Sequence, residues 1–193
     1  MIRAFIAIDL TPEIHLKLSK LCQRLQDAGL SPARWAPINN IHITMKFLGD
    51  IHEDLVRQIS ERLQALSAHH SPFEVGIGRL GAFPRLERAR VVWVGCDFSA
   101  RGLQLQSEIE TAMQELGIEK EERQFQPHLT IARVSKDVRP AEYTRMADVI
   151  RALQIQQLGT MRVGCINLYR SDLLHSGAKY QRLFSTPLSG RMD

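Results

Sequence analysis

Histidine and threonine recur at the same spacing in two distant parts of the chain. His42 precedes Thr44 by two residues in the segment IHITMKFLG, and His128 precedes Thr130 by two in PHLTIARV. Because the unperturbed pKa of histidine is about 6.5, a neutral imidazole can accept a proton near neutral pH while a protonated one donates a proton. Threonine hydroxyls can donate hydrogen bonds to phosphoryl oxygens. The four side chains together would suit acid–base chemistry on a phosphoester without a metal ion.

The first pair lies in a segment that has the pattern of a β-strand. Residues two apart face the same side of a strand, so His42, Thr44 and Lys46 are predicted to share one face. The opposite face then carries Ile41, Ile43, Met45 and Phe47. Such an apolar face can pack on a helix, whereas the polar face must meet water, a partner or a ligand because unpaired buried polar groups are costly.

The second pair has the same arrangement. His128 and Thr130 are predicted to share a face opposite Leu129 and Ile131. If the two polar faces meet across a cleft, two imidazoles and two hydroxyls form one site. Lys46 or Arg133 could then neutralise charge that develops in the transition state.

Zinc fits these residues less well than proton transfer does. His42 and His128 would supply two ligands, but no third Asp, Glu, His or Cys lies at a typical ligand spacing beside either one. The sequence therefore predicts neither a metal site nor a cofactor. The remaining histidines are expected to lie outside the site: His15, His52, His69, His70 and His175.

Helical and strand patterns alternate along the chain. The expected helices cover residues 12–28, 53–68, 100–116 and 140–153, with Thr11 and Ser99 as N-caps for the first and third. The expected strands cover residues 3–10, 34–36, 41–48, 73–80, 89–96, 127–134, 161–170 and 179–185. Several strand pairs are joined by short turns, which favours antiparallel pairing. We therefore expect an α+β fold.

The unit of a helix followed by a His-x-Thr strand occurs twice, at positions separated by nearly half the chain. No low-complexity linker divides the sequence. We expect residues 1–193 to form a single bilobal domain, in which two similar lobes pack together as one body.

Composition restricts the protein class only broadly. The chain has 193 residues, of which 44% are hydrophobic and 24% charged, and a formal net charge of +4. This mild positive charge is compatible with an anionic ligand and falls short of a dedicated duplex binder. No run approaches the length of a membrane span, and no signal peptide is expected. Three dispersed cysteines, Cys22, Cys96 and Cys165, favour free thiols in a reducing compartment, so a cytoplasmic protein without a membrane association is expected.

Four segments resemble the hallmarks of the two-histidine phosphoesterases. They are RAFIAIDL, RWAPINNIHITMKFLGD, QFQPHLTIARV and LYRSDLLHSGAKY, in the order that the family has. Within that superfamily the chain is most similar to the bacterial and archaeal RNA 2′,3′-cyclic phosphodiesterases, also called the 2′-5′ RNA ligase family. The resemblance covers nearly the whole chain. It implies a pseudo-twofold symmetric fold with mainly antiparallel sheets, outer helices and an active-site cleft between the lobes.

The same resemblance implies roles for individual residues. It carries catalysis onto His42 and His128, and phosphate binding onto Thr44 and Thr130. It also places Arg133 in or near the site, whereas strict strand alternation places Arg133 on the face opposite His128. Either the strand bends or ends near Ala132, or Arg133 reaches round from the rim.

The activity implied is hydrolysis of RNA 2′,3′-cyclic phosphate ends to 2′-phosphomonoesters. His42 is then the proton donor to O3′ and His128 the proton acceptor for water. This direction rests on the resemblance, because the near-symmetry of the two motifs leaves it open from the sequence alone. The same groups could also join a cyclic end to a 5′-hydroxyl as a 2′-5′ linkage.

Two alternatives remain. The first is the same chemistry on small cyclic nucleotides or 2′-5′ oligonucleotides. Arginines in the segment GRLGAFPRLERAR, namely Arg79, Arg85, Arg88 and Arg90, would favour RNA instead. The second alternative is a non-catalytic RNA- or nucleotide-binding module. Paired histidines argue against a module of that kind, because binding alone needs no proton donor and acceptor. No obligate protein partner is evident in the sequence.

Overall fold

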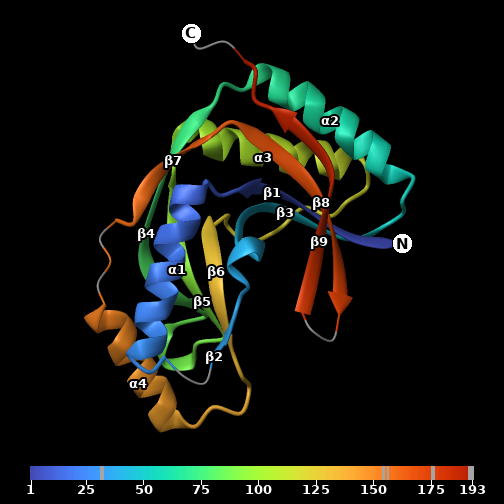
Figure 1. The fold of residues 1–193 in the computed structure, drawn as a ribbon. Helices are drawn as coiled ribbons and strands as arrows, with labels where there is room; N and C mark the ends of the chain where they lie inside the picture. Colours follow the sequence, from blue (N-terminus) through green and yellow to red (C-terminus); the bar gives the residue numbers. More distant parts are fainter. Residues whose placement is uncertain (31–32, 154, 156, 175–176, 191–193) are drawn as a thin grey trace.

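The strands form two antiparallel sheets. The computed structural model describes residues 1–30, 33–153, 155, 157–174 and 177–190. In this part of the chain, the first sheet has the strand order β3-β1-β8-β9 and the second the order β2-β6-β5-β4-β7 (Figure 1). The first sheet comprises β1 (Ile2–Asp9), β3 (His42–Ile51), β8 (Cys165–Leu174) and β9 (Gly177–Pro187). The second comprises β2 (Ala33–Trp35), β4 (Phe73–Phe83), β5 (Val91–Phe98), β6 (His128–Val134) and β7 (Gly159–Val163).

Four α-helices connect and cover the sheets in the described residues. They are α1 (Pro12–Asp27), α2 (Leu55–His69), α3 (Ala100–Glu115) and α4 (Pro140–Ala152), and single 3-10 turns occur at η1 (Ile38–Asn40) and η2 (Leu86–Arg88). Figure 1 shows α2 and α3 lying together over the first sheet, while α1 and α4 lie beside the second. None of these helices is long and apolar enough to cross a bilayer. The expected α+β fold with antiparallel sheets and outer helices is confirmed.

The helix starts follow from local chemistry, as the sequence predicted. The Thr11 hydroxyl accepts a hydrogen bond from the Ile14 amide at 3.4 Å, and the Ser99 hydroxyl accepts one from the Gly102 amide at 3.4 Å. Such caps satisfy amides that have no partner within the helix. Gly29, at φ 81°, follows α1 in the left-handed conformation that favours glycine.

The two halves of the chain exchange a strand. The order β3-β1-β8 in the first sheet corresponds to β6-β5-β4 in the second, with a histidine at the start of β3 and of β6. However, β4 belongs to the first half of the sequence and β8 to the second. Each sheet is therefore completed by a strand from the other half, and the two sheets are related as a pseudo-twofold repeat.

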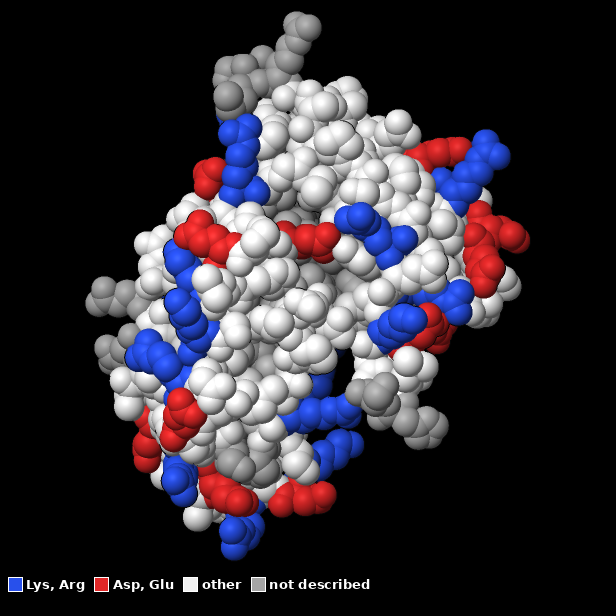
Figure 2. Space-filling view, viewed as in Figure 1, with Lys and Arg blue, Asp and Glu red and all other residues white. Residues whose placement is uncertain are grey.

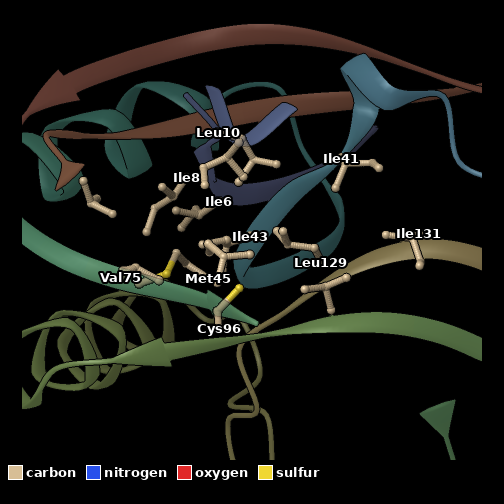
Figure 3. Close-up of a cluster of buried hydrophobic side chains, with 14 of the residues drawn as sticks. Ile6, Ile8, Leu10, Ile41, Ile43, Met45, Val75, Cys96, Leu129 and Ile131 are labelled. Atoms are coloured by element: carbon tan, nitrogen blue, oxygen red, sulfur yellow. The ribbon is translucent and has the colours of Figure 1, made fainter. Parts of the chain in front are cut away.

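One hydrophobic core joins the sheets. Ile6 and Ile43 of the first sheet belong to the same cluster of buried side chains as Val75 and Leu129 of the second, and all four are fully buried (Figure 3). On the two histidine strands, Ile43 and Leu129 alternate with the partly exposed histidine and threonine positions, as half-buried strands require.

The C-terminal strands differ from the expectation. The sequence predicts one strand over residues 161–170, but the structure divides this segment at Gly164 into β7 and β8, which belong to different sheets. Val163 pairs with Phe73 of β4, whereas Asn167 pairs with Ala7 of β1. The apolar pattern is continuous across Gly164, so it gives no sign that the chain changes sheets. Strand β8 also continues to Leu174 through residues that are expected to form a loop, while His175 lies outside the described residues.

Both histidine strands contain a β-bulge at the same place. On β3, Thr44 pairs with Ala7 and Lys46 with Ile6, so Met45 is the extra residue. On β6, Thr130 pairs with Trp93 and Ala132 with Val92, which makes Ile131 the extra residue. An extra residue reverses which face the following side chains occupy.

The bulge on β3 overturns the predicted position of Lys46. Its side chain does not share the face of His42 and Thr44 but is buried, with 4% of the residue exposed. The Lys46 ammonium donates to the Glu110 carboxylate on α3 at 2.6 Å and to the Glu119 carbonyl at 2.9 Å. Lys46 therefore joins β3 to α3 and is not a counter-charge in the site.

Breaking this buried pair should destabilise the fold. We expect Lys46→Met to lower the free energy of unfolding by about 3–5 kcal/mol, because the Glu110 carboxylate stays buried without its cation. The double variant Lys46→Met/Glu110→Met should recover much of that loss. Urea unfolding followed by circular dichroism measures both. Lys17→Met is the matched control, since Lys17 pairs with Glu13 at 2.6 Å on the surface and should change stability little. A double variant no more stable than Lys46→Met would contradict this account.

Candidate active site

The same type of hydrogen bond to the backbone holds each of the two histidines. His42 Nδ1 lies 2.8 Å from the Asn40 carbonyl oxygen, and His128 Nδ1 lies 2.7 Å from the Gln126 carbonyl oxygen. A carbonyl can only accept, so Nδ1–H is the donor in both rings. This bond fixes the tautomer and leaves Nε2 as the atom that can accept or deliver a proton.

Aromatic rings enclose His42 on two sides. Phe5 stacks on the imidazole with ring centroids 4.6 Å apart and planes 19° apart, and Tyr180 of β9 meets it edge-on at 5.3 Å. Phe5 is itself covered by Tyr169 at 5.4 Å and lies next to Tyr180 at 5.0 Å. This packing restricts the orientation of the imidazole beyond what its single hydrogen bond can do.

His128 has its own aromatic neighbours. Phe83 meets it edge-on with centroids 5.0 Å apart, and Trp93 lies at 6.4 Å. The Trp93 ring rests against Gly81, where a Cβ atom would overlap the indole. Glycine at this strand position therefore leaves room for the indole to lie against β4, next to His128.

The histidines are close enough to influence each other electrostatically. Burial lowers the pKa of His42, the hydrogen bond to Asn40 and the Asp9 carboxylate oppose that shift, and the charge of His128 adds to it. Strands β3 and β6, which carry the two histidines, also contact each other. His42 and His128, which the sequence predicts as halves of one site, therefore lie on neighbouring strands of the two sheets.

The two threonines follow their histidines on the same faces. Thr44 lies opposite Ala7, and Thr130 lies opposite Trp93. Both are partly exposed, and within the described residues neither hydroxyl is hydrogen-bonded. Their hydroxyls can thus donate to an oxygen of a ligand placed between the histidines.

The bulge at Ile131 accounts for Arg133. Without the extra residue Arg133 would point away from His128, but the bulge returns it to the face of His128 and Thr130, where it is exposed. Burial raises the pKa of Tyr180, and the positive charge of Arg133 opposes this shift. Because Tyr180 also touches His42, Arg133 lies within electrostatic reach of both histidine strands. Of the two explanations that the sequence left open, local distortion of the strand is correct.

On β3 the corresponding position after the bulge is Phe47. It lies on the His42 face with 67% of the residue exposed. The two strands thus share a bulge at the same place, but the residue that follows it on the histidine face is an arginine in one sheet and a phenylalanine in the other.

A pocket of about 300 Å³ adjoins His42. Its lining residues are Phe5, Asp9, Leu10, His15, Asn39, Asn40, Ile41, His42, Tyr169 and Tyr180. The sequence predicts no catalytic role for His15, which is one of the residues that line this pocket. The first turn of α1 returns to the end of β1, which brings His15 to the pocket although its helical position looks incidental in the sequence.

Asp9 is the main charged residue that the sequence did not single out. It lies directly opposite His42 and accepts hydrogen bonds from Tyr169 Oη at 2.8 Å and Asn167 Nδ2 at 3.2 Å. The residue opposite His128 is Gly95, which has no side chain. The two histidines therefore differ in charge environment. Only the pairing of distant strands reveals this difference, so motif spacing could not predict it.

The arginines proposed to favour RNA are dispersed. Arg79, on a bulge of β4, pairs with Asp97 at 3.2 Å, while Arg90 donates to the Ser135 carbonyl at 2.7 Å. Arg85 and Arg88 flank and end η2, which α4 contacts. They do not form one basic face. In the described residues, no three His, Cys, Asp or Glu side chains lie together as a metal ion needs.

Known proteins match this chain over most of its length. An RNA 2′,3′-cyclic phosphodiesterase from Methanothermobacter thermautotrophicus is 32% identical over 179 residues, covering 93% of this chain and 95% of that protein. One from Aeropyrum pernix is 31% identical, covering 91% and 98%.

Solved structures share the fold. The protein TT0787 of Thermus thermophilus superposes with a TM-score of 0.82 at 22% identity, covering 98% of this chain and 100% of that one. Escherichia coli LigT complexed with 3′-AMP gives a TM-score of 0.74 at 24% identity, covering 97% and 98%. The family model described as the 2′-5′ RNA ligase superfamily matches residues 12–173. The chain therefore belongs to the 2′-5′ RNA ligase superfamily.

Proposed function

We propose that the protein hydrolyses the 2′,3′-cyclic phosphate at an RNA end to a 2′-phosphomonoester. The observation that carries this proposal is the matched pair of imidazoles, each bound through Nδ1 to a carbonyl two residues earlier and interacting electrostatically with the other. The relatives described above, which are named RNA 2′,3′-cyclic phosphodiesterases, support the substrate class. The free thiols of Cys22, Cys96 and Cys165 favour a reducing compartment and hence the cytoplasm.

In this mechanism each histidine moves one proton. His128 Nε2 takes a proton from water as the water oxygen attacks phosphorus. The P–O3′ bond breaks, and His42 Nε2–H delivers its proton to O3′, leaving the phosphate on O2′. Thr44 and Thr130 donate hydrogen bonds to the non-bridging oxygens, and Arg133 balances their charge. A 5′-hydroxyl in place of water would give a 2′-5′ linkage through the same groups.

The pKa of His42 bears directly on this assignment. Burial favours its neutral form in the free site, whereas the proposed donor must be protonated. A bound phosphate anion favours the imidazolium, as Asp9 does. Binding of the substrate anion therefore favours the protonated form of His42, which the role of proton donor requires.

Removing either histidine should abolish the reaction while the fold persists. We expect His42→Ala and His128→Ala each to reduce kcat by about 100- to 10,000-fold, because general acid–base catalysis typically contributes that much. His52→Ala, which changes an exposed histidine outside the site, should retain activity.

The assay uses a short RNA with a 2′,3′-cyclic phosphate, in the presence of a chelator, and phosphorus NMR to locate the phosphate in the product. A 2′-phosphate is expected. A 3′-phosphate would reverse which oxygen leaves, and full loss of wild-type activity in chelator would contradict the proton-transfer account. A non-catalytic binding module would keep its RNA affinity in both variants and show no turnover to lose.

Asp9 allows the pKa of His42 to be located in the pH profile of the reaction. Asp9→Asn removes a carboxylate that raises the pKa of His42, so the pKa of His42 should fall. One limb of the bell-shaped profile of kcat/KM should therefore move to lower pH, and that limb reports His42, while the other limb stays in place. A profile in which neither limb moves would contradict an influence of Asp9 on a catalytic His42.

A further inference from the structure

Two arginines face each other on adjacent strands of the second sheet. Arg34 of β2 and Arg133 of β6 are directly opposite in the antiparallel register. Residues in such a pair lie on one face with their Cβ atoms close together, and like charges there are destabilising. Because the bulge places Arg133 on the His128 face, Arg34 lies on that face as well. The fold therefore places two guanidinium groups on one face beside His128, where a bound anion would reduce their mutual repulsion.

The arginine pair also spans the opening toward the first sheet. A Cβ atom at Gly177, the first residue of β9, would lie 3.5 Å from Arg34 Nη2. Arg133 acts on the pKa of Tyr180 three residues further along β9. Asn40 donates to the Ala178 carbonyl at 2.8 Å and so ties η1 to the same strand. Figure 2 shows Lys and Arg side chains gathered on the lower lobe of this face.

The two sides of His128 differ in whether their arginines are paired with a carboxylate. There Arg79 lies over Gly95, with Nη2 3.7 Å from where a Cβ would stand, but its guanidinium is paired with Asp97. Arg133 has no carboxylate partner among the described residues. An RNA strand leaving the histidines on the Arg133 side therefore meets a second guanidinium, that of Arg34, next to Arg133.

We propose that Arg34 binds the phosphodiester immediately 5′ of the terminal nucleotide, while Arg133 faces the cyclic phosphate. Two opposed guanidinium groups suit two successive phosphates, since each can form paired hydrogen bonds to phosphate oxygens. Arg34 is then a specificity residue that lets the enzyme prefer an RNA end to a cyclic mononucleotide. The inference rests on the proposed function for the identity of the substrate.

Two substrates that differ by one phosphodiester test this role. They are a nucleoside 2′,3′-cyclic phosphate and a dinucleotide that ends in the same group. Arg34→Gln should lower kcat/KM for the dinucleotide about 10-fold or more, because a charge-assisted hydrogen bond is lost, and leave the mononucleotide within about 2-fold. Arg34→Lys should restore part of the loss. Arg101→Gln, an exposed arginine on α3, is the control that should change neither substrate.

Binding gives an independent measure. Affinity for the dinucleotide product with a terminal 2′-phosphate should fall in Arg34→Gln, and the slope of log K against log salt should decrease by about 0.7, as for one phosphate contact on a single strand. Equal losses on both substrates, or no loss on the dinucleotide, would overturn the proposal. A loss confined to Arg79→Gln would overturn it too and direct the RNA over Gly95. If the wild type turns over neither substrate, the proposed function fails, while the binding data still decide whether Arg34 contacts a phosphate.

Discussion

A β-bulge directly after the threonine of each histidine strand determines which side chains reach the site. A regular strand would alternate without interruption, so a face that presents histidine and threonine would continue with the second residue after threonine. The bulges at Met45 and Ile131 interrupt that alternation. They turn Lys46 into the core, where it finds Glu110, and bring Arg133 to the polar side. A strand can thus present three closely spaced site residues and still bury its apolar ones.

The two histidines share the same hydrogen bond to the backbone but lie in different surroundings. Both imidazoles use Nδ1 to bind a carbonyl, yet His42 is stacked on Phe5 and faces a carboxylate across the strand, whereas His128 is flanked by Phe83 and Trp93 and faces a glycine. Acid–base catalysis requires one group to be charged when the other is neutral. Two identical environments would give both histidines the same preference. The strand partners, rather than the motifs, supply the difference.

Much of this arrangement could be predicted from local sequence. The paired motifs, the helix caps at Thr11 and Ser99 and the overall α+β class all depend on residues near one another in the chain. The bulges could not be predicted, because neither Met45 nor Ile131 is a glycine and a bulge exists only relative to the partner strand. The same holds for the burial of Lys46, which depends on a carboxylate far along the chain. The division at Gly164 depends on which sheet accepts each strand, and no local pattern records that choice.

The exchange of β4 and β8 has a consequence for how the protein can move. Each sheet is hydrogen-bonded through a strand that the other half of the chain supplies, and one core runs between them. A motion that moved the two halves of the chain apart would break these strand pairings. A motion that moved the two sheets apart would expose the shared core and strain the connection at Gly164, the single residue between β7 and β8. The scaffold therefore resists both motions and holds the spacing between the strands that carry His42 and His128, and in the proposed mechanism the reacting phosphate must fit that spacing.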